Sequence, residues 1–220
     1  MRVISIAASG NGSGKTLTLA AILKAHPGRL DAVKFTTVFK DGVHCPRTEK
    51  ACACRSLHGR FTVVTDPAVL ATEETDTGRL TLAGARSVLW CLAQPGAHSE
   101  AWDHLRRHVL DPGGDAITEG NSAVRILAPD LLVTVLSPSL DRERWKPDAW
   151  ELARRSDLVI INSYGASEGQ IEALGREVGR EAPGVRATVE DVSLPLDAWN
   201  DGRLRARVSE LLAAPGSGGA

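Results

Sequence analysis

A glycine-rich segment near the start of the chain restricts its fold and function more than any other feature. Residues 9–16 read Ser-Gly-Asn-Gly-Ser-Gly-Lys-Thr, between the apolar run 3–8 and the apolar helical pattern 17–23. A strand, a glycine-rich turn ending in Gly-Lys-Thr and a helix, in that order, are typical of a phosphate-binding loop. Ser9 departs from the motif G-x-x-x-x-G-K-[ST], in which the first position is glycine. We expect Gly10 and Gly12 to supply the flexibility that this glycine would give.

This loop predicts nucleotide binding. Glycines let successive backbone N–H groups converge on phosphate oxygens, and the N-terminus of the next helix adds its own N–H groups and its dipole. The lysine of the motif reaches the β- and γ-phosphates, and the threonine hydroxyl can bind Mg²⁺. The residues predicted to bind the nucleotide here are Gly10, Asn11, Gly12, Ser13, Gly14, Lys15 and Thr16.

Composition narrows the class of protein. The chain has 220 residues and a formal net charge of −1. This length suffices for one domain with a sizeable core, which we place at residues 1–212, before a small-residue tail at 213–220 that we expect to be disordered. The near-zero charge does not favour nucleic acid or an anionic membrane as a partner. No apolar run approaches the ~20 residues that span a bilayer. The first predicted strand starts at residue 3, which leaves no room for a signal peptide before it, so we expect a cytoplasmic protein.

The rest of the chain predicts a layered α/β domain. Apolar strands are expected at 31–37, 61–64, 87–92, 115–118, 131–136, 157–162 and 185–189. Helical segments are expected at 80–85, 99–110, 147–154, 167–180 and 201–213, with a brief helix opening at Asp66-Pro67. This alternation predicts a three-layer P-loop NTPase fold of the α/β class, with a mostly parallel sheet flanked by helices. Ligands of such sheets bind at the carboxyl ends of the strands.

Three charged residues outside the loop are candidates for the same site. Glu119 ends a strand before a glycine, where nucleotide hydrolases place an acid that holds Mg²⁺. Asp76 is a competing or additional metal-facing acid, although its acidic stretch also fits an exposed loop. Lys34 has apolar neighbours, where an ammonium is costly unless it meets an anion such as a γ-phosphate or substrate; a lysine at a sheet edge is the alternative. We predict Lys15, Lys34, Asp76 and Glu119 as catalytic residues, and Thr16, Glu119 and Asp76 as the Mg²⁺ site.

Asn162 ends the strand at 157–162, at the place where guanine-nucleotide proteins read the base with Asn-Lys-x-Asp. The lysine and the aspartate of that motif are replaced by Ser163 and Gly165. We therefore predict that Asn162 contacts the base edge without a choice between ATP and GTP; a turn asparagine is the equal alternative.

A polar segment at about residues 40–60 gathers three of the four cysteines. Together with two histidines they offer enough soft ligands for Zn²⁺ or an iron–sulfur cluster, although the spacing differs from common zinc motifs. Redox chemistry is the second interpretation. The fourth cysteine, Cys91, lies in an apolar strand and is expected to be a small core residue. The predicted ligands are His44, Cys45, Cys52, Cys54 and His58.

The order of these motifs resembles that of the MobB-type nucleotide-binding adaptors of molybdenum-cofactor biosynthesis. The resemblance runs to about Arg180, and it is carried by Gly14-Lys15-Thr16, Val33-Lys34, Asp76-Thr77-Gly78-Arg79 with Ala83-Gly84-Ala85, and Glu119-Gly120. It implies a dimerising P-loop protein of the class that includes metal-insertion GTPases and dethiobiotin-synthetase-like enzymes, with Asp76 at the Mg²⁺ or nucleotide site. The chain departs from the family at Ser9, at Phe35 in place of a histidine, and in the Cys/His segment, which indicates a divergent member.

The leading hypothesis is a Mg²⁺-dependent NTPase with slow hydrolysis that assists the biosynthesis or insertion of a metal-containing cofactor. We expect it to form a homodimer and to act with a partner protein of cofactor biosynthesis. One alternative is an ATP-dependent small-molecule kinase or ligase, with Lys34 on the substrate. Another is a non-catalytic adaptor that nucleotide regulates.

Overall fold

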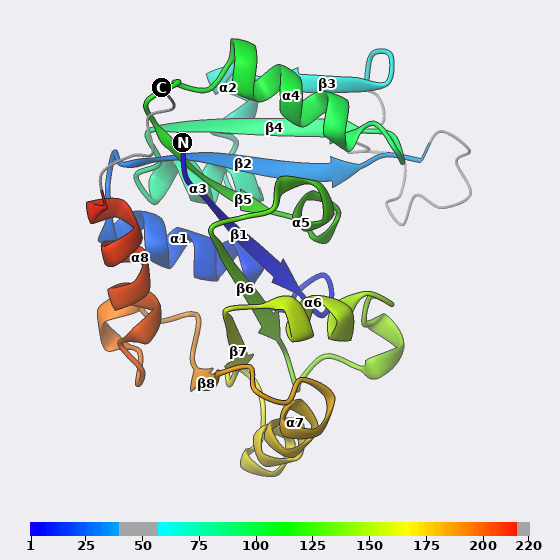
Figure 1. Ribbon diagram of the computed structural model, residues 1–220, viewed down its shortest axis with the longest axis vertical. Coiled ribbons are helices and arrows are strands. Elements are labelled where there is room, and N and C mark those ends of the chain that lie inside the picture. Colours follow the sequence, from blue (N-terminus) through cyan, green and yellow to red (C-terminus); the bar gives the residue numbers. More distant parts are fainter. Residues whose placement is uncertain (40–56, 215–220) are drawn as a thin grey trace.

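An eight-stranded sheet runs through the centre of the protein (Figure 1). The computed structural model describes residues 1–39 and 57–214. The strand order is β3-β4-β2-β5-β1-β6-β7-β8, and every neighbouring pair is parallel except β3 and β4. The strands are β1 (Val3–Ala8), β2 (Leu30–Thr37), β3 (Phe61–Val64), β4 (Ser87–Ala93), β5 (Asp115–Glu119), β6 (Leu131–Leu136), β7 (Leu158–Asn162) and β8 (Ala187–Glu190).

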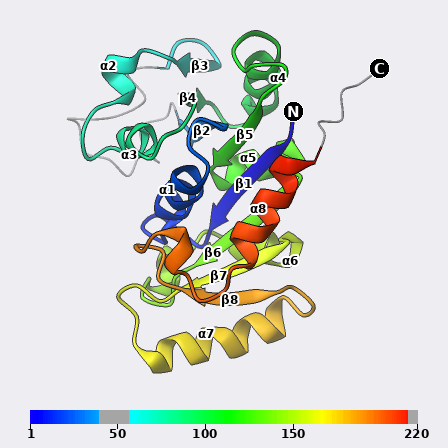
Figure 2. The ribbon, with the colours of Figure 1, turned by 90° about the vertical axis from the view of Figure 1, so that its left-hand side faces the viewer.

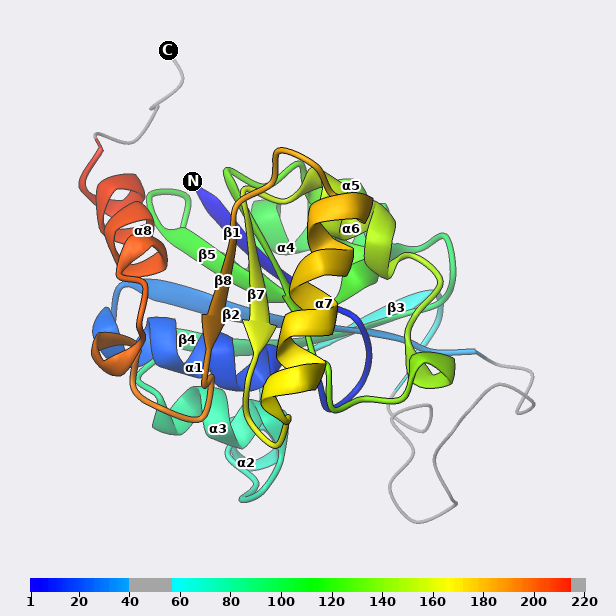
Figure 3. The ribbon, with the colours of Figure 1, turned by 90° about the horizontal axis from the view of Figure 1, so that it is seen from below.

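Helices cover both faces of the sheet (Figures 2 and 3). One face packs against α1, α3 and α8, and the other against α4, α5, α6 and α7. Strand β1 is buried along its whole length because it has helices on both sides, which explains its continuous apolar sequence. The predicted three-layer α/β architecture is therefore confirmed. The helices are α1 (Lys15–Ala25), α2 (Pro67–Leu70), α3 (Asp76–Leu82), α4 (His98–His108), α5 (Asn121–Leu127), α6 (Ala149–Arg155), α7 (Glu168–Glu181) and α8 (Arg203–Ala213), with short 3-10 turns η2 (Arg142–Arg144) and η3 (Leu196–Ala198).

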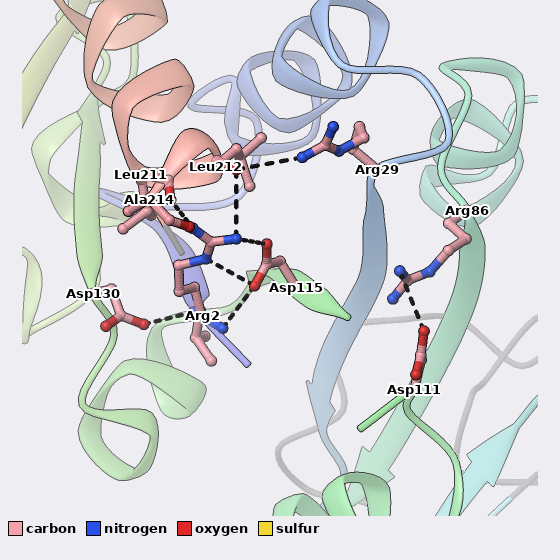
Figure 4. A network of polar contacts seen from close by, with 10 residues as sticks. Arg2, Arg29, Arg86, Asp111, Asp115, Asp130, Leu211, Leu212 and Ala214 are labelled. Carbon is pink, nitrogen blue, oxygen red and sulfur yellow. Dashed lines mark hydrogen bonds and ion pairs between the residues drawn. The ribbon is translucent and has the colours of Figure 1, made fainter. Parts of the chain in front are cut away.

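The last helix is tied to the first strand by arginine side chains (Figure 4). The Arg2 guanidinium pairs with Asp115 on β5 at 2.6 Å and donates to the carbonyl oxygens of Leu211 and Ala214 at the end of α8. Arg29 donates to the Leu212 carbonyl at 3.3 Å. The final carbonyls of a helix have no partner within the helix, so these arginines satisfy them. Arg2 also joins α8 to the starts of β1 and β5, and Arg29, the residue before β2, joins α8 to that strand.

The structure differs from the predicted elements most clearly at α3 and α5. The helix expected at 80–85 is α3, which begins four residues earlier, because the Thr75 side chain accepts a hydrogen bond from the Gly78 N–H and caps the helix at that point. Asp76 is consequently the first residue of a helix, and the alternative interpretation of its stretch as an exposed loop is wrong. Helix α5 was not predicted; it is one short segment directly after the turn at Gly120. Cys91 is fully buried in β4, as expected of a core residue.

Within the described part of the chain, no helix is both long enough and apolar enough to cross a membrane.

Candidate functional site

The glycine-rich loop joins the end of β1 to the start of α1, as its sequence predicts. The Ser13 hydroxyl accepts a hydrogen bond from the Gly10 N–H at 2.9 Å and lies 2.8 Å from the Ser9 hydroxyl. Ser9 is fully buried, and its hydroxyl also accepts from the Ser137 N–H at 3.3 Å. The departure from glycine at this position therefore has a structural reason, because the Ser9 side chain braces the loop from inside.

Close packing explains two of the loop glycines. A Cβ on Gly10 would lie 2.7 Å from the Arg144 carbonyl oxygen, and one on Gly14 would lie 2.6 Å from Val192. Gly14 also has a φ of 102°, which side chains rarely adopt. Any larger residue at either position would push the loop away from the segments behind it.

Asn162 supports the loop from β7. Its side chain is buried, donates to the Ser13 carbonyl at 3.2 Å and accepts from the Tyr164 N–H at 3.1 Å. These contacts give Asn162 a role in positioning the glycine-rich loop. A contact with the nucleotide base remains a prediction.

Four of the residues predicted from distant parts of the sequence meet beside the loop. Lys34 on β2 stands opposite Glu119 on β5 in the strand register, with its ammonium 3.4 Å from the Glu119 carboxylate. The same ammonium forms an ion pair with Asp76 at the start of α3. The Thr16 hydroxyl donates to Glu119 at 2.8 Å. Lys34, Asp76, Glu119 and Thr16 therefore form one connected polar cluster.

Asp76 is held in its ionised form. Burial by itself would raise the pKa of this carboxyl, but the charge of the Lys34 ammonium and its hydrogen bond bring the pKa below its ordinary value. Lys34 therefore joins the two acids, Asp76 and Glu119, and Thr16 donates to the second of them. A hydroxyl and two carboxylates beside the glycine-rich loop are hard oxygen donors of the kind that Mg²⁺ requires, so these residues fit that ion.

Lys15 is a cation without a paired carboxylate among the described residues. Its ammonium donates to the Gly10 carbonyl at 3.1 Å. Burial, followed by repulsion from the nearby Lys146, lowers the pKa of Lys15 to about 8. A carboxylate in contact with this buried ammonium would raise its pKa. The low pKa of Lys15 therefore indicates that an anion bound beside it would stabilise its charged form.

Lys146 is a site residue that sequence reasoning missed. Its backbone N–H donates to the Ser9 carbonyl at 2.6 Å, and its side chain lines the same cleft as Lys15. Burial lowers the pKa of Lys146, and the carboxylates of Asp148 and Glu119 oppose the shift in part. The residue comes ten positions after the end of β6. No spacing in the sequence places it near the loop, because the intervening segment folds back over the loop and carries it there.

These residues line a cleft of about 1250 Å³ that continues past the phosphate-binding loop. Beyond Lys34 the cleft follows the end of β2 and reaches the first residues of α4 and α5. Thr37, His98 and Ser122 line this far part and are joined by hydrogen bonds. No motif or spacing in the sequence indicated this second group.

Most residues of the predicted Cys/His site lie outside the described part of the chain. His44, Cys45, Cys52 and Cys54 lie outside the described residues. His58 is exposed before β3, and its backbone N–H donates to the Thr62 hydroxyl at 2.7 Å. Among residues 1–39 and 57–214, no three His, Cys, Asp or Glu side chains form a group that could hold a metal. A Zn²⁺ or iron–sulfur site therefore remains a prediction.

No protein-family model matches the chain, and no curated protein sequence matches it. The resemblance to the MobB-type adaptors therefore remains a prediction.

Proposed function

We propose that the protein binds a nucleoside triphosphate with Mg²⁺ and transfers its γ-phosphoryl group. The observation that carries this proposal is the cluster beside the loop lysine, in which Thr16 donates to Glu119 and Lys34 joins Glu119 to Asp76. A loop built for phosphate, followed directly by oxygen donors for Mg²⁺, supports a triphosphate better than a single phosphate group.

Each residue of the cluster has a distinct part in this function. The loop backbone and Lys15 bind the β- and γ-phosphates, and Lys34 on β2 and Lys146 in the segment between η2 and α6 line the same cleft near the transferring group. Thr16, Glu119 and Asp76 hold Mg²⁺, which neutralises phosphate charge when it is bound. The protein contributes mainly by positioning charges before the reaction, because phosphoryl transfer needs little covalent chemistry from the enzyme.

The size of the cleft favours a second molecule as the acceptor. Small-molecule sites usually occupy about 300–1,000 Å³. The cleft here is about 1250 Å³, and its far part contains polar groups that a triphosphate on the loop does not need. This supports the small-molecule kinase or ligase among the predicted functions. Cofactor delivery, a homodimer and a partner protein remain predictions, since the cysteines that motivated the first lie outside the described residues.

Release of phosphate from γ-³²P-labelled ATP and GTP tests the proposal, with and without Mg²⁺. We expect Mg²⁺-dependent turnover by the native chain and a loss of about 10²-fold for Glu119→Gln, which removes a carboxylate charge from the Mg²⁺ site. Glu100→Gln, an acid exposed on α4, is the matched control and should turn over normally.

Turnover that is equal with and without Mg²⁺, or equal in Glu119→Gln and the native chain, would contradict the proposal. Binding of Mg²⁺-nucleotide without any turnover, also after a small-molecule extract of the source cells is added as a source of acceptor, would instead favour the nucleotide-regulated adaptor.

A further inference from the structure

We propose that the far part of the cleft binds a small, partly apolar alcohol as the phosphoryl acceptor, and that Ser122, Thr37 and His98 remove its proton. This inference rests on the proposed function and specifies the acceptor's chemical class.

The three side chains form a continuous hydrogen-bonded chain. The Thr37 hydroxyl is 2.9 Å from the Ser122 hydroxyl and 3.0 Å from His98 Nε2. They come from three elements, namely the last residue of β2, the first turn of α5 and the first residue of α4. His98 is only 7% exposed, and Ser122 lies at the more open end of the chain. The arrangement leads from the cleft to a buried imidazole.

Two of the three hydrogen-bonded side chains come shortly after residues of the predicted phosphate site in the sequence. Thr37 follows Lys34 by three residues on β2, and Ser122 follows Glu119 by three residues at the end of β5. Lys34 and Glu119 stand opposite each other in the register, and Thr37 at the end of β2 and Ser122 in the first turn of α5 follow them in the sequence and line the same cleft. A Cβ on Gly120 would lie 3.1 Å from the Phe35 carbonyl oxygen, which keeps the turn between Glu119 and Ser122 tight.

The walls of this part favour an uncharged, partly apolar ligand. Phe35, Ile126 and Pro95 line it beside the hydroxyl groups. The Arg125 guanidinium, on the same helix as Ser122, is paired with Glu151 at 3.0 Å. The positive charge of Arg125 is therefore already paired, and it does not favour an anionic ligand.

An alcohol acceptor needs a base, and His98 can serve as one. Burial lowers the pKa of His98, which keeps the imidazole neutral near pH 7. In the tautomer with the proton on Nδ1, Nε2 accepts from Thr37, and Thr37 accepts from Ser122. The Ser122 oxygen then has a lone pair for the acceptor's hydroxyl group.

In the transfer step, these three side chains relay the acceptor's proton to His98. The acceptor oxygen forms a bond to the γ-phosphorus while the bond from that phosphorus to the β–γ bridging oxygen breaks, and the nucleoside diphosphate leaves. The acceptor's proton passes to Ser122, the Ser122 proton to Thr37, and the Thr37 proton to His98 Nε2. The imidazolium later releases one proton to water.

The test uses the full chain with Mg²⁺ and γ-³²P-labelled ATP or GTP, and the probe is a small-molecule extract (below ~3 kDa) of the source cells. We expect the native chain to place label on an organic compound as a phosphate ester that hydroxylamine does not cleave. His98→Gln and Thr37→Val should lower kcat for this transfer at least ~10-fold and leave the KM and Kd of the Mg²⁺-nucleotide within ~2-fold. His108→Gln, the same change at the exposed end of α4, should behave as the native chain.

Three results would overturn the inference. They are hydrolysis of nucleotide with no label on any organic compound, unchanged kcat in both relay variants, and a labelled product that hydroxylamine cleaves, which indicates a carboxylate acceptor. If the native chain neither binds nor hydrolyses nucleotide, the proposed function fails as well, and the binding data distinguish that case from the first three.

Discussion

At the scale of single residues, the site holds positive charge at a cost to the protein's stability. Lys15 is the clearest case, because burial lowers its pKa from 10.5 to about 8. At neutral pH the ammonium must still be charged in the folded state, where it lacks the hydration that it has in the unfolded chain. A bound triphosphate would repay this cost by supplying the missing anion.

Lys15→Met should therefore stabilise the nucleotide-free protein by about 1–3 kcal/mol at pH 7, since one pKa unit corresponds to about 1.4 kcal/mol. The unfolded chain binds more protons than the folded one between pH 8 and 10.5, so the native protein should gain stability as the pH rises through that window. Urea denaturation at pH 7 and 9.5 measures both effects. Lys24→Met, an exposed lysine on the same helix, serves as the control. A native chain and a Lys15→Met variant with the same pH dependence would disprove this account of Lys15.

At the scale of elements, the ends of helices and strands set the positions of the functional groups. Helix α3 begins at Asp76 because of the Thr75 cap, and this start turns Asp76 toward Lys34. Strand patterns and glycine-rich turns were readable from the sequence, since they depend on neighbouring residues. The start of α3 and the existence of α5 were not, because short helices of about two turns depend on tertiary packing more than on their own propensity.

The attachment of α8 makes a prediction at the same scale. Arg2→Ala removes the pairing with Asp115 and the donors to the last carbonyls of α8, so it should lower the free energy of unfolding by about 1–3 kcal/mol. Arg207→Ala removes an exposed pair on α8 and should change stability by less than about 0.5 kcal/mol. Chemical denaturation measures both variants, and hydrogen exchange should show faster opening of α8 in Arg2→Ala alone. Equal stability of the two variants would show that Arg2 does not anchor the helix.

At the scale of the whole molecule, the parallel sheet gathers groups that are far apart in the sequence. Lys15, Lys34, Asp76 and Glu119 were predicted for one site, and they line one cleft, in which Lys34 contacts both acids. They could be predicted because strand ends in such a sheet share one edge. Lys146 and the Ser122–Thr37–His98 chain could not, since they depend on how the segments after β6 and β4 fold back onto that edge. The sequence therefore indicated the phosphate side of the cleft, and only the fold revealed its far side.

Titration calorimetry with Mg²⁺-ATP and Mg²⁺-GTP tests the central claim most directly. The account predicts saturable binding of at least one of the two nucleotides at one site per chain, weaker without Mg²⁺ and reduced at least ~10-fold in Lys15→Met. An absence of binding heat for both nucleotides at several temperatures, with the protein folded, would contradict it.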